Sequence, residues 1–238
     1  MAITSQIIDY RDGETPLSGV MFSNSATPER RPGVLVVHGG AGLDDHALKR
    51  AESIAELGFT VLACDMYGSE VRGNRERIMA LLNDFRGNPA QLCQRAQAAI
   101  NLLASHPQVE RGLAAVGYCF GGMTVLELAR SGAGLAGVVS VHGSLATTRL
   151  AQPGSVKAKI LVCHGALDPH VPMSHVSAFI DEMNHAGADW QLDIYGGALH
   201  GFTHDSGPAL PGVAYNATAD ARSAAAIRTF FTELFGPV

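Results

Sequence analysis

The chain has 238 residues, of which 16% are charged and 47% are apolar, and its formal net charge is −5. This balance supplies a sizeable apolar core and excludes the basic stripe that is typical of nucleic-acid-binding proteins. No apolar run reaches the roughly 18 residues of a membrane-spanning helix, and residues 1–17 lack the basic and apolar regions of a signal peptide. The four cysteines form no CxxC pair, so we expect reduced thiols and a cytoplasmic protein without a membrane span.

The N-terminal half predicts a hairpin followed by alternating strands and helices. The neighbouring segments Gln6–Tyr10 and Leu17–Phe22 resemble an antiparallel hairpin at the edge of a sheet. The elements predicted next are a buried strand at Val34–Val37, a helix at residues 45–57 that Gly58 closes, a strand at Phe59–Ala63, an irregular polar segment at residues 64–78 and a helix at residues 90–104.

The C-terminal half continues this alternation. The predicted elements are strands at Leu113–Val116, Val138–Val141, Ile160–Cys163 and Leu192–Tyr195, helices that start at Met123, Met173 and Ala217, and a loop at residues 206–215. Strands separated by helices indicate an α/β protein with a mostly parallel sheet of about seven or eight strands and helices on both faces. No Pro/Ser-rich linker divides the chain, so residues 1–238 are predicted to form a single domain.

Reactive or glycine-rich segments directly follow four of the predicted strands. These segments are Cys119, Asp168, His200 and the triplet His38-Gly39-Gly40. Ligands of open parallel sheets bind outside the carboxyl ends of the strands. The four segments are therefore predicted to converge on one site.

The stretch GYCFGG, residues 117–122, passes from a strand pattern to a helix pattern. It fits a nucleophile elbow, G-x-nucleophile-x-G, with Cys119 in the place that serine usually takes. Side chains at Gly117 and Gly121 would collide with neighbouring backbone in such a strained turn, and the dipole of the following helix favours a thiolate. The chain order of nucleophile, acid and histidine is that of α/β-hydrolases, so we predict the α/β-hydrolase fold.

The chain resembles the dienelactone hydrolase (carboxymethylenebutenolidase-like) family of α/β-hydrolases over residues 17–236. The matching segments are the elbow, His164-Gly165-x-x-Asp168 with Val171-Pro172, and His200-Gly201-Phe202, with supporting matches at Cys64-Asp65-Met66-Tyr67-Gly68 and from Tyr215 to Phe231. The resemblance implies a triad in which Cys119 is the nucleophile, His200 the general base and acid, and Asp168 the group that orients the imidazole.

The resemblance also implies the reaction and its other participants. A small ester or lactone would be hydrolysed through a thioester, with the oxyanion held by the backbone N–H groups of Phe120 and Gly40 and with no cofactor. The expected partner is this small-molecule substrate, and we expect a monomer or a homodimer.

Two positions depart from the family pattern. The best-known members carry a glutamate where Gly39 stands, and an arginine for a substrate carboxylate where His204 stands. The predicted substrate contacts are Gly39, Tyr67, Tyr118, Phe202 and His204. Arg72, Arg75 and Arg77 are candidates for a second carboxylate contact. The hydrolase chemistry thus follows from the resemblance, whereas the identity of the substrate stays open.

Other interpretations of the same residues remain open. Cys119 could be an inert buried thiol, Asp168 could cap the turn before Pro169, and His200 could be a hydrogen-bonded histidine at a strand end. The GGAGLDD loop fails the dinucleotide-binding fingerprint, and the histidines form no HExxH motif, so no metal site is predicted. The alternative functions are a broad carboxylesterase, a thioesterase and a non-enzymatic α/β-hydrolase module that binds a ligand; the last predicts a missing triad member, and all three candidates are present.

Overall fold

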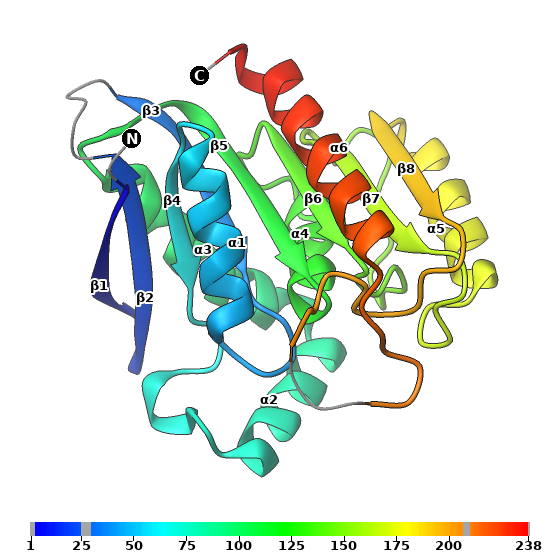
Figure 1. Cartoon of the computed structure of the whole chain (residues 1–238), viewed down its shortest axis with the longest axis horizontal. Coiled ribbons are helices and arrows are strands. Elements are labelled where there is room, and N and C mark those ends of the chain that lie inside the picture. Colours follow the sequence, from blue (N-terminus) through cyan, green and yellow to red (C-terminus); the bar gives the residue numbers. More distant parts are fainter. Residues whose placement is uncertain (1–2, 25–29, 207–209, 238) are drawn as a thin grey trace.

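The computed structural model describes residues 3–24, 30–206 and 210–237. Its described strands form one eight-stranded sheet in the order β1-β2-β4-β3-β5-β6-β7-β8 (Figure 1). The strands are β1 (Ile3–Asp12), β2 (Thr15–Asn24), β3 (Arg31–Val37), β4 (Thr60–Cys64), β5 (Val109–Tyr118), β6 (Gly137–Val141), β7 (Lys159–Gly165) and β8 (Trp190–Tyr195). The hairpin β1–β2 joins β4 in antiparallel pairing, and the other neighbouring strands are parallel. The predicted α/β class and mostly parallel sheet are confirmed.

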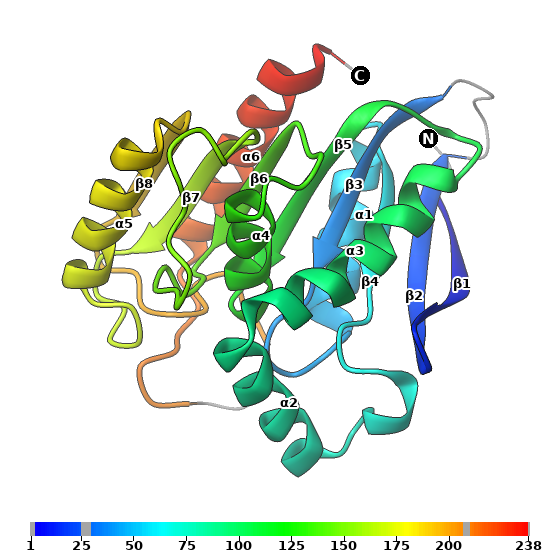
Figure 2. The ribbon, with the colours of Figure 1, turned by 180° about the vertical axis from the view of Figure 1, so that it is seen from behind.

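Helices cover both faces of the sheet. They are α1 (Asp45–Glu56), the short 3-10 helix η1 (Ser69–Val71), α2 (Arg75–Gly87), α3 (Pro89–Ser105), α4 (Phe120–Arg130), α5 (Met173–Ala186) and α6 (Ala217–Phe235). α1 and α6 lie on one face (Figure 1), and α3, α4 and α5 lie on the other (Figure 2). Within β3, Val34 and Val36 join the apolar core of the first face, whereas Leu35 and Val37 join that of the second. A strand buried on both faces explains the continuous apolar run in the sequence.

One segment differs from the prediction. The sequence predicts an irregular segment at residues 64–78, but this is wrong for its last residues, because α2 begins at Arg75. Asn74 caps α2, and Ile78, Leu82 and Phe85 bury one face of it. Charged residues surround these apolar positions and obscure their helical spacing. α2 lies beyond the carboxyl ends of the strands, where the sequence places the site (Figure 1).

A buried ionic cluster joins α4 to α5. The Arg130 guanidinium lies 2.9 Å from Glu127 of the same helix and 2.8 Å from Glu182 of α5, and it donates to the Leu145 carbonyl at 2.8 Å. The three charged side chains are at most 4% exposed. α4 begins directly after Cys119 and α5 follows the loop of Asp168, so the cluster connects two segments of the predicted site.

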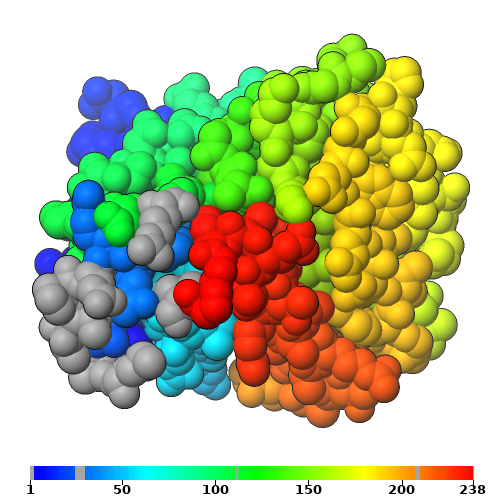
Figure 3. Space-filling view, turned by 90° about the horizontal axis from the view of Figure 1, so that it is seen from above, coloured from blue at the N-terminus to red at the C-terminus, as the bar shows by residue number. Residues whose placement is uncertain are grey.

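The opposite end of the sheet is covered. Seen from above, the C-terminal part of α6 lies at the centre of the face at the amino ends of the strands (Figure 3). Across the three described ranges, no helix combines the length and the apolar character that a membrane span requires.

Candidate active site

The turn between β5 and α4 is strained at Cys119. This residue has φ 54° and ψ −111°, a conformation that costs a non-glycine residue about 1–3 kcal/mol. A Cβ at Gly117 would lie 1.9 Å from Gly121 O, and a Cβ at Gly121 would lie 2.1 Å from Val37 O. Glycine is therefore required at both positions. The turn places the sulfur at the N-terminus of α4, beyond the carboxyl end of β5, as in the predicted elbow.

Cys119, His200 and Asp168 meet at this end of the sheet. Cys119 Sγ lies 3.2 Å from His200 Nε2, and His200 Nδ1 lies 2.8 Å from Asp168 Oδ2. The other carboxylate oxygen, Oδ1, accepts hydrogen bonds from the backbone N–H groups of His170 and Val171. These N–H groups hold the carboxylate, which in turn orients the imidazole toward the sulfur.

Electrostatics at the site favour a thiolate paired with an imidazolium. Burial opposes ionisation of Cys119, but the hydrogen bond and charge of His200 and the N–H groups of Gly40 and Phe120 lower the pKa of the thiol. Burial also opposes the imidazolium, yet the hydrogen bonds to Asp168 and Cys119 raise the pKa of His200 to about 10. Both shifts favour the ion pair in which the thiol proton is on His200 and the sulfur is a thiolate.

Asp168 stays ionised beside this pair. Burial alone would raise its pKa, but the hydrogen bond and charge of His200, together with the two backbone N–H groups, lower the pKa of the carboxyl below its usual value. The carboxylate therefore carries the negative charge that stabilises the imidazolium.

The loop after β3 aims the Gly40 N–H at the sulfur. His38 is fully buried, burial lowers its pKa, and its Nε2 accepts a hydrogen bond from the Met66 N–H at 3.1 Å. The proton of the neutral ring is therefore on Nδ1, which donates to the Gly39 carbonyl at 2.7 Å. No cis peptide occurs in the described ranges, so the Gly40 N–H of the same peptide unit points away from that carbonyl, toward Cys119.

Two of the predicted substrate contacts, Gly39 and His204, lie near Cys119. A Cβ added at Gly39 would lie 3.7 Å from Cys119 Cβ and 3.9 Å from His204 Cε1, so the absent side chain leaves space next to the sulfur. His204 stacks on His46 with ring centroids 3.8 Å apart. Burial lowers the pKa of His204, so the ring is uncharged at neutral pH.

Tyr67, Tyr118 and Phe202, which were also predicted as substrate contacts, are buried. Tyr67 packs on His38 and donates its hydroxyl to the Gly40 carbonyl at 3.4 Å, so it supports the loop after β3. Tyr118 and Phe202 are 3% and 0% exposed and belong to the apolar core on the side of α1 and α6. This placement is that of core side chains and gives neither ring a face toward a substrate.

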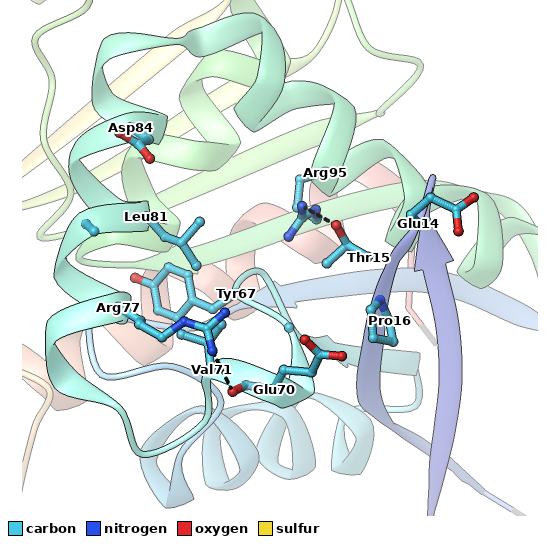
Figure 4. A pocket seen from close by; sticks show the side chains of 12 residues that line it. Glu14, Thr15, Pro16, Tyr67, Glu70, Val71, Arg77, Leu81, Asp84 and Arg95 are labelled. Carbon is cyan, nitrogen blue, oxygen red and sulfur yellow. Dashed lines mark hydrogen bonds between the residues drawn. The ribbon is translucent and has the colours of Figure 1, made fainter.

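A cavity of about 440 Å³ lies beside α2 (Figure 4). The β1–β2 turn, residues 67–71 and α2 bound it, and the Tyr67 ring lines it. Arg72, Arg75 and Arg77 are all exposed to solvent, and Arg77 lines this cavity and donates to the Glu70 carbonyl at 3.4 Å. Cys119 and His200 do not line it, so this cavity is not the pocket of the nucleophile.

Three residues at the site were missed by sequence reasoning, namely His46, His142 and Thr203. His142 follows β6 as Cys119 follows β5, and its Nδ1 accepts a hydrogen bond from the Cys119 N–H at 3.1 Å. Its position at a strand end is a signal that could have found it. His46 and Thr203 carry no such signal. Within residues 3–24, 30–206 and 210–237, no group of three or more His, Cys, Asp or Glu residues is arranged to hold a metal ion.

The comparison with protein families gives one decisive match. The model of the dienelactone hydrolase family matches residues 17–235. The chain belongs to the dienelactone hydrolase family. A comparison with curated proteins gives no significant match.

Solved structures share the fold of this chain. A dienelactone hydrolase-like promiscuous phosphotriesterase from metagenomic libraries is 39% identical to this chain. The match covers 99% of this chain and 100% of that chain, with a TM-score of 0.91. A putative dienelactone hydrolase from Klebsiella pneumoniae is 18% identical, with all of both chains covered and a TM-score of 0.82. An acylaminoacyl peptidase from Pyrococcus horikoshii is 14% identical, with 99% of this chain and 42% of that chain covered and a TM-score of 0.76. The α/β-hydrolase fold and membership of a hydrolase family are confirmed.

Proposed function

We propose that this protein hydrolyses small carboxylic esters or lactones with Cys119 as the nucleophile. The observation that carries the proposal is the contact between Cys119 Sγ and His200 Nε2 at 3.2 Å, where the N–H groups of Gly40 and Phe120 face the same sulfur. A thiolate, an acid–base group and two oxyanion donors are the groups that acyl transfer uses. Membership of the dienelactone hydrolase family supports the same reaction class.

The first half of the proposed reaction forms a thioester. The Cys119 thiolate attacks the carbonyl carbon, and the electron pair of the C=O bond moves to the oxygen, which accepts hydrogen bonds from Gly40 and Phe120. One such donor typically lowers the barrier by about 3 kcal/mol. When the tetrahedral intermediate collapses, the C–O bond to the leaving group breaks, and His200 transfers its Nε2 proton to the alkoxide.

The second half hydrolyses the thioester and restores the resting pair. Neutral His200 takes a proton from water, and the water oxygen attacks the thioester carbonyl carbon at the same oxyanion position. Collapse breaks the C–S bond and returns the thiolate, while His200 stays protonated and Asp168 stays ionised. The net reaction consumes one water and releases a carboxylic acid and an alcohol, without a cofactor.

Phosphotriesters are a second candidate substrate class. The relative that is 39% identical over 99% of this chain is described as a promiscuous phosphotriesterase, which favours this candidate. In the proposed step the Cys119 thiolate attacks phosphorus, the N–H groups of Gly40 and Phe120 hold the phosphoryl oxygen, and the aryloxide leaves. Water then releases the phosphodiester and the thiolate.

A panel of substrates tests the proposal. We expect p-nitrophenyl acetate and neutral lactones to be hydrolysed by the natural protein and not by Cys119→Ala. Diethyl p-nitrophenyl phosphate is included in the panel to test phosphotriester hydrolysis. Because His204 offers no cation, we expect uncharged esters to react faster than lactones that carry a carboxylate. Thr229→Val, an exposed substitution on α6, is the control. Equal hydrolysis by the natural protein and Cys119→Ala would remove the nucleophile assignment, and no hydrolysis of any substrate would favour a binding module.

A further inference from the structure

His142 is a buried histidine that contacts the backbone of Cys119 and packs edge-on against the His200 ring. It is 0% exposed and has φ 40°, and among the described residues only Cys119 shares a positive φ outside glycine. Its Nδ1 accepts a hydrogen bond from the Cys119 N–H at 3.1 Å, and its ring centroid lies 5.4 Å from that of His200. The proposed reaction gives this ring no step, although it contacts both reacting residues.

The partners of His142 determine which of its ring nitrogens accepts a hydrogen bond and which donates one. The Cys119 N–H, which also donates to the Val141 carbonyl at 3.0 Å, can only donate, so His142 Nδ1 is unprotonated and the proton of the neutral ring is on Nε2. Burial keeps the ring neutral, because it lowers the pKa of His142 well below the usual value. Nε2–H therefore donates to Thr203 Oγ1 at 2.8 Å, and the Thr203 hydroxyl is left to donate to His46 Nε2 at 3.0 Å.

Thr203 belongs to the same loop as His200, and hydrogen bonds hold both its hydroxyl and its carbonyl. It is 1% exposed, and its carbonyl accepts a hydrogen bond from Arg50 Nη2 at 2.6 Å. The same Arg50 nitrogen lies 2.9 Å from Asp220 of α6. The Thr203 hydroxyl thus links the loop of His200, held by α1 and α6, to the backbone of the nucleophile through His142.

We propose that Thr203 and His142 are positioning residues, which hold the His200 loop against the Cys119 elbow while the sulfur is acylated. This inference rests on the proposed function. In the resting protein the thiolate itself holds His200 Nε2. A thioester sulfur has no charge with which to hold it, so the imidazole that must activate water depends on Asp168 and on the anchoring of its own loop.

The link therefore matters more for hydrolysis of the thioester than for its formation. Thr203→Val keeps the shape of the side chain but removes the acceptor for His142 and the donor to His46. A small displacement of His200 is enough to slow a reaction, since a misplacement of 1 Å can cost roughly 100-fold. Thr203→Ser retains the hydroxyl and is the matched variant.

The test is rapid-mixing kinetics with p-nitrophenyl acetate. For Thr203→Val we expect kcat to fall about ten-fold while kcat/KM stays within about three-fold, because kcat/KM reports steps up to acylation. A burst of p-nitrophenolate equal to the enzyme concentration should then appear. Thr203→Ser should follow the natural protein, and Thr229→Val is the control for a threonine-to-valine change elsewhere. An unchanged kcat, or equal losses in kcat and kcat/KM, would overturn the proposal.

A second measurement needs neither activity nor a variant. In the natural protein labelled with ¹⁵N-histidine, nuclear magnetic resonance should show a slowly exchanging proton on His142 Nε2 at neutral pH. A proton on Nδ1, or a charged ring, would overturn the proposal even if Thr203→Val failed to fold. If the natural protein hydrolyses no ester, the proposed function fails, whereas this spectrum still reports on the link itself.

Discussion

Replacing Gly121 by alanine tests how the elbow packs against β3. The new Cβ would lie 2.1 Å from Val37 O, 2.7 Å from Val37 C and 2.8 Å from His38 O, all of which are backbone atoms that cannot rotate away. Carbon atoms pack favourably at about 3.5–4.0 Å, so either α4 or the end of β3 must move by roughly 1 Å. Overpacking costs about 1–3 kcal/mol, and rigid backbone on both sides places this change at the upper end.

The expected loss of stability is measurable. We expect Gly121→Ala to lower the free energy of unfolding by about 3 kcal/mol. For chains of this length each kcal/mol typically shifts Tm by roughly 2–4 °C, so Tm should fall by about 6–12 °C. The same movement displaces the loop that carries Gly40, so kcat/KM for p-nitrophenyl acetate should fall about 100-fold.

Thermal denaturation followed by circular dichroism, together with ester hydrolysis at 25 °C, measures both effects. Gly87→Ala is the matched control, because a Cβ there meets nothing within 4 Å and the residue ends α2. An unchanged Tm and unchanged activity in Gly121→Ala would refute the argument from close approach.

Two further predictions concern the charge of Cys119 and the loop after β3 that carries Gly40. Because the pKa of Cys119 is lowered, its thiolate should persist below the pKa of about 8.5 of a free thiol and be lost as pH falls through the lowered value, so iodoacetamide should alkylate Cys119 faster than a free thiol at neutral pH. His200→Gln should move this alkylation profile to higher pH, and an unmoved profile would show that His200 does not stabilise the thiolate. His38→Phe keeps a planar ring but cannot donate to the Gly39 carbonyl, so kcat should fall by up to about 100-fold with little change in KM. A kcat equal to that of the natural protein would mean that the Gly40 N–H needs no support from His38.

The parts of the structure that depend on local patterns could be predicted from the sequence. The run Val34–Val37 alternates between two buried faces, and the elbow requires glycine at position 117, where a Cβ would meet Gly121 of the same turn. The contact of Cys119 with His200 at 3.2 Å follows from strand ends that meet at one edge of the sheet.

The parts that depend on tertiary contacts could not be predicted. α2 was missed because charged residues surround its three buried apolar positions. Tyr118 and Phe202 were assigned to the substrate pocket because their residue type suits either role, and only their position in the fold shows that they are core side chains. The partners of His142 are Cys119, between β5 and α4, and Thr203, in the loop after β8, so no short stretch of sequence contains them.

The Arg130 cluster makes the side chains at positions 127, 130 and 182 depend on one another. Loss of Arg130 would leave Glu127 and Glu182 as uncompensated charges in the interior, and removal of one partner from such a group costs about 3–5 kcal/mol. Added salt cannot rescue this loss, because buried pairs are hardly screened. Variant libraries that diversify these positions one at a time will therefore yield mostly unfolded protein. Simultaneous replacement of all three residues by apolar residues of similar volume can preserve the fold.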